Sequence, residues 1–539
     1  MGFARTRSVT LVGVDGVVVE VQADLEPGVT TFTLVGLPDK TLVESRERVR
    51  AAVVNSGEEW PQRRLTVGLS PATVPKTGSG FDLPIAAAVL AAAGVLDPRA
   101  IEDLVMVGEL GLDGRLRPVR GVLPAVMAAA AAGCTRVVVP AVAACEAELV
   151  PGVTVHGVLS LRHLLALLRG EPVPAEERAV ADIGLGPDPL AVAGALFAGP
   201  APAGAEPADL ADVAGQDRAR RALEVCAAGG HHLFLLGSPG AGKTMLAERL
   251  PGILPPLDGP ASLEVSAVHS IAGTLRPDLP LVTTPPFCAP HHSATMPAIV
   301  GGGNGMPRPG AVSLAHRGVL FMDESPEFSG RVLDALRQPL ESGTVTVARS
   351  GGMVCFPARF LLVMAANPCP CGRFSGRGLD CTCSSLMRHK YLSRLSGPLM
   401  DRIDVRVTVD AVSRAELLAP EGAGERSAVV AGRVRAARER AGRRLAETGW
   451  SVNAEVPGRE LRTRWAVAPD ALDRAARDME RGLLTARGLD RVLRVAWTIA
   501  DLRGHDRPSR ADVDAALELR TGIVRGDPPA DAGSGEGGP

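Results

Sequence analysis

The sequence has little lysine, no long apolar segment and no marked excess of charge of either sign. Only four of its 539 residues are lysine, whereas 54 are arginine. A lysine retained in such a chain is informative, because lysine and arginine bind phosphate groups differently. The longest apolar run, Ile85 to Leu96, has 12 residues and is too short to span a bilayer. The first residues also lack the apolar centre of a signal peptide, so we expect a soluble, cytoplasmic protein with no membrane partner.

The net charge and the cysteines exclude two further classes of protein. At a net charge of -2 the chain has no general basic surface, so any contact with nucleic acid must be local. Nine cysteines, four of them between 369 and 383, do not resemble the disulfide framework of a small secreted protein. A length of 539 residues exceeds what one hydrophobic core usually holds, which predicts two or three domains.

Composition and periodicity divide the chain into five parts. Short β-rich runs alternate with alanine-rich helical stretches over residues 1–170, which predicts an α/β domain. Residues 171–207 are rich in proline, alanine, glycine and glutamate, which is typical of a linker. The strand–loop–helix pattern returns over 208–410, and arginine-rich helical sequence follows over 411–525. Residues 526–539 are predicted to form a disordered tail.

The run GSPGAGKT at 237–244 is the strongest motif, because it matches G-x-x-x-x-G-K-[ST] between an apolar strand and an amphipathic helix. Its glycines let backbone N–H groups converge on phosphates at the positive end of the helix. Lys243 would neutralise the β- and γ-phosphate oxygens, and Thr244 would hold Mg²⁺. The strand–loop–helix context argues against a chance match. The predicted nucleotide-binding residues here are Gly237, Ser238, Pro239, Gly240, Ala241, Gly242, Lys243, Thr244 and Met245.

Two later strands end in polar residues that suit the same chemistry. An apolar strand at 318–322 ends in Asp323 and Glu324. Asp323 would bind the Mg²⁺ shell, and Glu324 would orient and deprotonate the attacking water. Paired acids often mark only a solvated strand end, but their position after a phosphate loop favours the catalytic interpretation. A third strand ends at Asn367, where a γ-phosphate sensor would lie, although asparagine is also a common turn residue.

Together with further segments, these motifs resemble the magnesium-chelatase-like AAA+ family. The segments that carry the resemblance are DLADVAGQ, GSPGAGKT, PHHSATMPAIVGGG, RPGAVSLAHRGVLFMDESPEFS, AANPCPCG and YLSRLSGPLMDRIDV. The similarity extends from residue 1 to about residue 525. It implies an α/β fold class, with a Lon-protease-like α/β domain, a P-loop AAA+ core built on a parallel αβα sheet, and a C-terminal helical lid. It also implies ATP and Mg²⁺ as cofactors.

The same resemblance identifies these motifs as Walker A, Walker B and the first sensor, and adds arginines from the C-terminal half. Arg402 matches the arginine finger that reaches a neighbouring subunit's nucleotide, where a guanidinium stabilises charge on the γ-phosphoryl group. The alternatives are that Arg402 pairs with its flanking aspartates or that Arg394 is the finger. A second sensor is expected from a lid helix, where Arg487 and Arg494 both qualify and Arg487 is preferred. A finger that acts between subunits implies a ring of identical chains, and we expect a hexamer.

The resemblance also places residues at the adenine and at DNA. Val213, Gly215 and Gln216 would line the adenine end of the pocket. Residues 344–356 alternate around a Ser-Gly-Gly turn, which by itself predicts a β-hairpin. In related helicases such a hairpin contacts the DNA backbone, so Arg349 near its tip is the candidate phosphate contact. An exposed turn arginine without a partner is an equally good interpretation.

Residues 1–170 resemble the Lon-protease-type domain of this family but lack its catalytic residues. Where the protease has its serine, the chain reads GSGFD, and Gly80 takes the serine's place when no gap is introduced. The helix start that carries the protease's lysine reads GVLPA here. Without a lysine to accept its proton, the neighbouring Ser79 has no activating base. We therefore expect a non-proteolytic binding or assembly module.

Four cysteines lie close together just after the third strand. They are Cys369, Cys371, Cys381 and Cys383. In a cytosolic protein such a cluster indicates a structural, tetrahedral zinc site more than disulfides. The C-x-C spacing is shorter than the usual one, so free thiols are an equal alternative. His389 is a substitute ligand, whereas His291 and His292 are expected to form hydrogen bonds within their loop.

Three functions are consistent with an ATP-hydrolysing chain of this kind. The favoured one is a DNA-translocating helicase that acts on single-stranded or branched DNA and promotes branch migration in recombination or natural transformation. The second is a magnesium-chelatase motor, although such motor subunits lack a fused N-terminal domain. The third is a Lon-like protease or protein-remodelling factor, against which the missing serine–lysine dyad argues.

Overall fold

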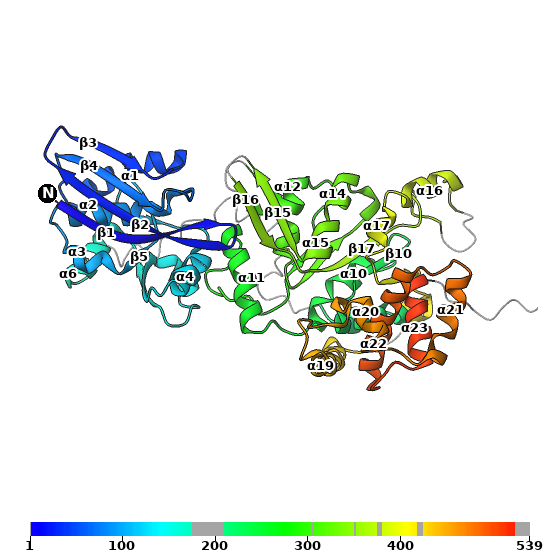
Figure 1. Ribbon diagram of the computed structural model, residues 1–539. Helices are drawn as coiled ribbons and strands as arrows, with labels where there is room; N and C mark the ends of the chain where they lie inside the picture. Colours follow the sequence, from blue (N-terminus) through cyan, green and yellow to red (C-terminus); the bar gives the residue numbers. More distant parts are fainter. Residues whose placement is uncertain are drawn as a thin grey trace, which may run out of the picture.

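The structure is a computed structural model that describes residues 2–174, 208–303, 307–349, 352–374, 380–417 and 424–522. Most of the predicted linker at 171–207 and all of the predicted tail at 526–539 lie outside the described residues. Two β-sheets organise the N-terminal and central parts, and helices form the C-terminal part (Figure 1). This mixed α/β architecture confirms the predicted fold class.

The N-terminal sheet has seven strands of mixed direction. Their order is β3 (Thr31–Val35), β4 (Arg64–Ser70), β2 (Asp15–Glu26), β1 (Gly2–Val12), β5 (Leu104–Met106), β8 (Arg136–Pro140) and β9 (Thr154–Val158). β1 and β2 form a long antiparallel hairpin, whereas β5, β8 and β9 run parallel. Four longer helices accompany the sheet, namely α1 (Lys40–Asn55), α2 (Asp82–Ala92), α4 (Val122–Ala131) and α6 (Leu161–Arg169). Every residue of α2 is buried, which explains its nearly continuous apolar sequence.

The central sheet has five strands, and all of its pairings are parallel. Their order is β11 (Phe287–Cys288), β14 (Val319–Met322), β17 (Leu361–Ala366), β10 (Leu233–Gly237) and β18 (Val405–Val409). In a parallel sheet the carboxyl ends of the strands meet at one edge, which is where such sheets bind ligands. The loops after β10, β14 and β17 are those that carry the predicted phosphate, acid and sensor residues.

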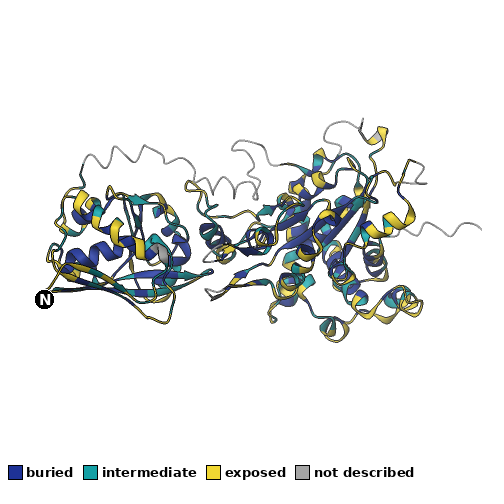
Figure 2. Ribbon diagram, turned by 90° about the horizontal axis from the view of Figure 1, so that it is seen from above, coloured by how far each residue is buried: buried dark blue, intermediate teal, exposed yellow. Residues whose placement is uncertain are grey.

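Alternate residues of the central strands face two separate cores, because side chains alternate across a strand. Leu233 and Leu235 of β10 belong to a core shared with the C-terminal helices, while Phe234 belongs to the core on the opposite face. Figure 2 shows the central sheet largely buried, whereas strands of the N-terminal sheet alternate between buried and more exposed residues. The C-terminal helices are α19 (Ser427–Leu445), α20 (Gly458–Arg462), α21 (Asp473–Glu480), α22 (Ala486–Arg503) and α23 (Arg510–Thr521). Among the described helices, none is both long and apolar enough to cross a membrane.

The N-terminal part contacts the central part at two places (Figure 1). Glu146 accepts hydrogen bonds from the Leu123 N–H at the start of α4 and from the Ser270 hydroxyl on α11 (Gly259–Ala272). At the tip of the β1–β2 hairpin, Val12 and Val14 pack against the core that also contains the hairpin formed by β15 (Thr344–Arg349) and β16 (Gly352–Pro357). The N-terminal part therefore rests on the same side of the central sheet as that second hairpin.

Candidate functional site

The predicted phosphate loop connects β10 to α10 (Lys243–Glu248). Gly240 and Gly242 have φ angles of +76° and +91°, which residues with a Cβ rarely adopt. A Cβ built at either position would have no described atom within 4 Å. Glycine therefore allows the backbone to take this shape and leaves open space above the loop, as a bound triphosphate requires.

Lys243 is nearly buried, with 7% of its surface exposed. Its Nζ donates hydrogen bonds to the carbonyl oxygens of Gly237 and Ser238, at 2.7 and 2.9 Å, and to Asn367 Oδ1 at 3.1 Å. Burial lowers the pKa of Lys243, and the carboxylates of Asp323 and Glu324 oppose that shift. The lysine thus connects the phosphate loop to the end of β17, where the sensor was predicted.

The predicted acids lie beside the phosphate loop. Thr244 Oγ1 donates a hydrogen bond of 2.8 Å to Asp323 Oδ2, so the segments 237–244 and 323–324 meet, as the sequence predicts. A hydroxyl and a carboxylate oxygen side by side are ligand types that suit Mg²⁺ together with phosphate oxygens. The donor set present at this edge of the sheet therefore fits the predicted magnesium–nucleotide.

Glu324 has two features that the sequence did not reveal. Its φ angle is +49°, a left-handed conformation that is uncommon for a residue other than glycine and that often marks functional sites. Its Oε2 lies 3.2 Å from His292 Nδ1, in the loop after β11. Only His291 forms the expected bond within its loop, from Nδ1 to the Ser293 hydroxyl at 2.8 Å. The PHHS segment was recognised in the sequence, but nothing in it indicated which histidine would reach the acid.

Tyr391 is a second residue that sequence analysis missed. It lies on α16 (Ser385–Leu392) and is 5% exposed. Burial and the nearby carboxylates of Glu327 and Glu324 raise its pKa to about 12, while a hydrogen bond with the Asn367 backbone opposes this shift. The side chain therefore stays neutral and fills the space between the acids and the sensor.

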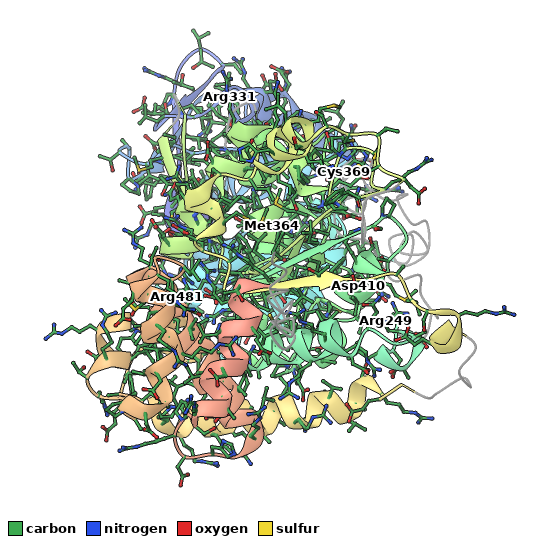
Figure 3. The ribbon with its side chains drawn as sticks, turned by 90° about the vertical axis from the view of Figure 1, so that its right-hand side faces the viewer. Arg249, Arg331, Met364, Cys369, Asp410 and Arg481 are labelled. Atoms are coloured by element: carbon green, nitrogen blue, oxygen red, sulfur yellow. The ribbon has the colours of Figure 1, made fainter. Side chains whose placement is uncertain are left out.

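Gln216 lies at the back of the phosphate loop, in a left-handed conformation with φ of +58°. Its Nε2 donates to the carbonyl oxygens of Ala241, at 3.3 Å, and of Asp410. Asp410 directly follows β18, and Figure 3 labels it on the same side of the molecule as Cys369. Val213 is buried close by in sequence, and Met245 on α10 is exposed. The hydrogen bond from Gln216 to Ala241 therefore joins the segment predicted at the adenine to the phosphate loop.

Arg402 lies away from this cluster, between α17 (Gly397–Met400) and the start of β18. Its side chain is 17% exposed and pairs with Glu341 on α15 (Arg337–Ser342) instead of with a flanking aspartate. A second hydrogen bond runs to the Pro398 carbonyl, and its buried Nε has no partner within the described part of the chain. Burial lowers the pKa of Arg402, and the positive charges of Arg337, Arg491 and Arg487 add to that effect.

The two candidate second sensors differ in their surroundings. Arg487 is exposed near the start of α22 and lies close enough to Arg402 to affect its pKa. Arg494, two turns further along α22, donates from Nε to the Val456 carbonyl at 2.7 Å, and burial lowers its pKa. Arg494 is therefore bonded within the helical part, which favours the exposed Arg487 as the second sensor.

Arg394, the alternative finger, lies closer to the acids than Arg402. Its Nη1 donates to the Pro326 carbonyl at 3.0 Å and pairs with Glu327 at 3.2 Å. Both partners belong to the short 3-10 turn Ser325–Glu327 that directly follows Glu324. Arg394 is thus tied to the acid segment of its own chain.

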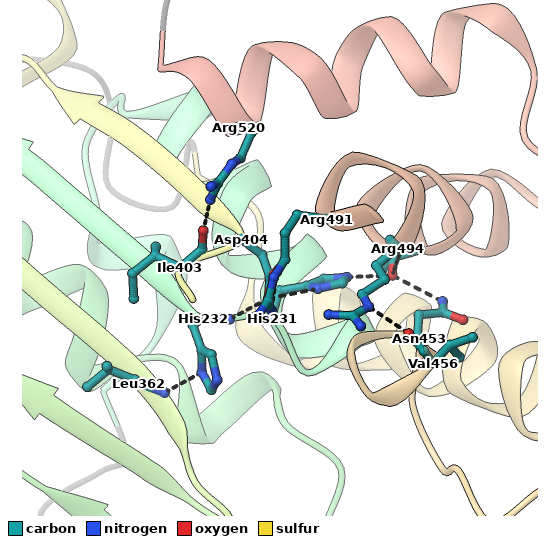
Figure 4. A network of polar contacts seen from close by, with 11 residues as sticks. His231, His232, Leu362, Ile403, Asp404, Asn453, Val456, Arg491, Arg494 and Arg520 are labelled. Carbon is teal, nitrogen blue, oxygen red and sulfur yellow. Dashed lines mark hydrogen bonds and ion pairs between the residues drawn. The ribbon is translucent and has the colours of Figure 1, made fainter. Parts of the chain in front are cut away.

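A buried polar network ties the helical part to the central sheet (Figure 4). Asp404, fully buried, pairs with Arg491 of α22 at 2.8 Å and with His231 Nδ1 at 3.5 Å. Burial alone would raise the pKa of Asp404, but Arg491 and His231 bring it below its usual range. Arg520 of α23 donates to the Ile403 carbonyl. The segment that carries Arg402 is therefore fixed by the C-terminal helices.

The hairpin predicted at 344–356 is present, with antiparallel pairs from Thr344 with Pro357 to Arg349 with Gly352. Residues 350 and 351 and the side chain of Arg349 lie outside the described part of the structure. Val345 and Phe356 are buried at the base of the hairpin, whereas Met353 near its tip is 70% exposed. The base is thus anchored in the core, whereas Met353 further along the hairpin is exposed.

In the N-terminal part, the hydroxyl of Ser79 donates to Glu109, and the fully buried Lys76 donates to the Pro71 carbonyl. Arg48 and Asp82 form an ion pair of 2.8 Å nearby. Among these described contacts, Ser79 and Lys76 are bonded to Glu109 and Pro71 and not to each other.

The four cysteines after β17 converge, and their sulfur atoms all lie within 4.8 Å of one another. Among the described residues His389 is not part of this group; it is exposed on α16. The backbone N–H of Arg373 lowers the pKa of Cys371, and hydrogen bonds from its neighbouring thiols add to the shift.

Three family models match successive parts of the chain. A model described as subunit ChlI of Mg-chelatase matches residues 21–143. One described as magnesium chelatase, subunit ChlI, matches 209–417, and its C-terminal counterpart matches 424–520. The magnesium-chelatase subunit ChlI of Euglena gracilis is 27% identical over 156 residues, which is 25% of this chain and 45% of that protein.

Other relatives match along nearly their full length. An uncharacterised protein of Mycobacterium tuberculosis is 50% identical over 526 residues, covering 97% of this chain and 100% of the relative. The competence protein ComM of Haemophilus influenzae is 39% identical over 525 residues, covering 96% of this chain and 98% of ComM. The protein YifB of Escherichia coli is 40% identical over 519 residues, covering 94% and 95% of the two chains. The chain therefore belongs to the magnesium-chelatase-like ComM/YifB family of AAA+ proteins.

Proposed function

We propose that this chain binds ATP with Mg²⁺ between the phosphate loop and the acids after β14, and hydrolyses it. The observation that carries this proposal is the 2.8 Å contact between Thr244 Oγ1 and Asp323 Oδ2, because it joins the two halves of a magnesium–phosphate site. Lys243 neutralises the β- and γ-phosphates, and Glu324 accepts the proton of the attacking water. Thr244 and Asp323 would hold Mg²⁺, which would offset the charge of the phosphate oxygens.

The sensor and the adenine end complete the same pocket. Asn367 accepts a hydrogen bond from Lys243 at 3.1 Å. A γ-phosphate that binds Lys243 would therefore also lie near Asn367, at the end of β17. Gln216 supports the loop from behind at Ala241. Both contacts support the roles proposed for these residues, the first as γ-phosphate sensor and the second at the nucleoside end.

We propose further that a neighbouring copy supplies Arg402, which makes the active form a ring, most simply a hexamer. β18 pairs in parallel with β10, so that Val405 lies opposite Leu233 and Val409 opposite Gly237. Arg402 precedes Val405 and thus lies at the edge opposite the phosphate loop, about 15 Å away along the strand. It cannot reach its own nucleotide, and only the site of another chain is available to it. Arg487, close to Arg402, belongs to the same intersubunit pocket.

We propose that hydrolysis drives movement along single-stranded or branched DNA and promotes branch migration during recombination or natural transformation. Two observations support this function. The full-length similarity to a protein named for competence points to DNA uptake. The β15–β16 hairpin extends from a buried base, which allows Arg349 at the end of β15 to contact a phosphate backbone.

Two other functions have less support. A chelatase motor agrees with the names of the family models, but the Euglena gracilis ChlI subunit is similar over only 25% of this chain, whereas ComM is similar over 96% of it. A Lon-like protease would need a lysine base at Ser79, whose hydroxyl is instead bonded to Glu109. Both remain alternatives to the helicase for what ATP hydrolysis drives.

The deciding experiment measures ATP turnover by the full chain with no DNA, with single-stranded DNA and with forked DNA, beside assays for metal insertion into a porphyrin and for casein degradation. We expect stimulation by DNA only. Arg349→Ala should reduce that stimulation, whereas Arg481→Ala, which removes an exposed arginine of the helical part, should not (Figure 3). Turnover that no DNA stimulates would contradict the helicase while leaving the ATPase in place.

A further inference from the structure

The four cysteines after β17 form a group with the geometry of a tetrahedral metal site. Sulfur atoms held about 2.3 Å from one zinc ion lie about 3.8 Å from each other. Here Cys371 and Cys381 are 3.7 Å apart, Cys369 and Cys381 are also 3.7 Å apart, and Cys369 and Cys371 are 3.3 Å apart. All four sulfurs, that of Cys383 included, lie within 4.8 Å of one another. These spacings are too long for disulfides, whose sulfurs are about 2.05 Å apart.

The two C-x-C pairs lie at opposite ends of the connection between β17 and α16. Cys369 is fully buried and comes two residues after Asn367, at the end of β17. Cys383 is 8% exposed and directly precedes Ser384, the N-cap of α16. An ion shared by both pairs would therefore join the sensor to the helix that carries Tyr391. The convergence of four thiols from the two ends of this connection, with all sulfurs within 4.8 Å, is what distinguishes this group from chance proximity along the chain.

The first pair is also in contact with the phosphate loop. Gly372 has a φ angle of +74°, and a Cβ built there would lie 2.4 Å from Pro239 Cγ and 2.7 Å from its Cδ. The backbone beside Cys371 thus packs directly on the loop, with no room for a side chain. Glycine is required at this position both by its conformation and by the closeness of the proline.

The second pair is supported by its own neighbours. Arg388 on α16 donates from Nη1 to the Cys383 carbonyl at 3.2 Å. Its guanidinium also lies 4.0 Å from the ring centre of Phe374, which follows the first pair. Through this cation–π contact and its hydrogen bond, Arg388 connects the segment that follows the first pair with the segment that carries the second pair.

We propose that Cys369, Cys371, Cys381 and Cys383 bind one Zn²⁺, and that this ion holds the segment 369–372 against the phosphate loop. The second statement rests on the proposed ATP site, whereas the first does not. The ion crosslinks a loop that would otherwise be closed only by weak contacts, and metal binding stabilises such a loop by constraining it. Asn367 and Pro239 are the two nucleotide-site residues that this crosslink positions.

The first test measures bound metal in the full chain by mass spectrometry. We expect about one zinc per chain, retained in the control variant Cys145→Ser, which alters an exposed cysteine outside the group. The double variant Cys381→Ser, Cys383→Ser should lose the zinc. Replacement by Co²⁺ should give the visible absorption of a tetrahedral thiolate site in the wild type only. A wild-type chain without zinc, or a double variant that retains it, would overturn the site.

The second test measures the affinity for a fluorescent ATP analogue. Gly372→Val should keep the zinc but press on Pro239, and the affinity should fall about tenfold, which corresponds to about 1.4 kcal/mol. Gly133→Val is the matched control, because Gly133 also has a positive φ, +80°, and a Cβ there would have no described atom within 4 Å. Equal affinities in the two valine variants would overturn the positioning role.

The two tests separate the proposals. A chain that binds zinc but no nucleotide at all would contradict the proposed ATP site while the metal site stands. Should the double serine variant fail to fold, removal of the metal from the wild type with a chelator, followed by return of Zn²⁺, replaces it. The affinity for the ATP analogue should then fall when zinc is removed and recover when it is returned. An affinity that does not change with the metal content would overturn the positioning role.

Discussion

Lys76 and Lys243 are two of only four lysines, and both precede a threonine in a glycine-rich turn. Both are nearly or fully buried, at 0% and 7% exposed, and burial lowers the pKa of each. Within the described residues, the Lys76 side chain donates to the Pro71 carbonyl of its own loop. Lys243 donates to two loop carbonyls and to Asn367, from a different strand.

The difference lies in what the neighbouring strands deliver. Around Lys243 three parallel strands end at one edge, so a hydroxyl, two acids and an amide converge on the loop. Burial is the cause of the pKa shift of Lys76, while in the same part of the chain Asp82 pairs with Arg48 and Glu109 accepts a hydrogen bond from Ser79. The same residue types therefore form a reactive site in one part of the chain and a stable core in the other.

The largest expected effect tests the difference between Lys243 and Lys76 directly. Lys243→Ala should reduce ATP turnover to the limit of detection, because it removes the cation beside the developing phosphate charge. Lys76→Ala should leave turnover per folded chain unchanged but lower the free energy of unfolding by roughly 2 kcal/mol, through loss of a buried side chain. Turnover assays and urea unfolding of both variants check this. Loss of turnover in a folded Lys76→Ala chain would show that the N-terminal part shares in the chemistry.

The second effect concerns the opposite edge of the central sheet. Arg402→Ala should bind ATP normally and hydrolyse it about a thousandfold more slowly. Mixing it with Lys243→Ala chains should restore part of the turnover, because some interfaces then combine an intact loop with an intact arginine. Glu341→Gln, which releases the partner of Arg402, is the control and should retain hydrolysis. Mixtures that stay inactive would contradict an arginine that acts between chains.

Much of the arrangement at the phosphate-loop edge of the central sheet was predictable from the sequence. The phosphate loop, the acids and Asn367 each follow an apolar strand, and strands of a parallel sheet end together, so their meeting required no knowledge of distant contacts. The partners of Arg402 and Glu324 were not predictable, because Glu341 and His292 come from segments whose approach depends on packing. Likewise the sequence provided only a preference between Arg487 and Arg494, since both lie on α22. The difference that the structure adds is the hydrogen bond from Arg494 to the Val456 carbonyl.

A third prediction sharpens the contrast between those two arginines. Arg487→Ala should lower turnover about tenfold with little change in stability, because the side chain is exposed and close to Arg402. Arg494→Ala should instead lower the free energy of unfolding by about 1–2 kcal/mol, since it leaves the Val456 carbonyl without its donor. Turnover and thermal unfolding of both variants distinguish the outcomes. A reversed pattern would make Arg494 the sensor.

The smallest effect concerns how Glu324 is oriented. His292 lies 3.2 Å from its carboxylate, while His291 has its ring tilted by 34° against that of His292, with ring centres 4.0 Å apart, and forms a hydrogen bond with Ser293 in the same loop. His292→Ala should therefore lower kcat severalfold without changing KM, because the acid loses a positioning contact and the nucleotide does not. His291→Ala, the matched control, should leave both constants within twofold. Equal loss in the two variants would mean that the loop supports the site only by its fold, whereas a change in KM alone would place His292 at the nucleotide and not behind the acid.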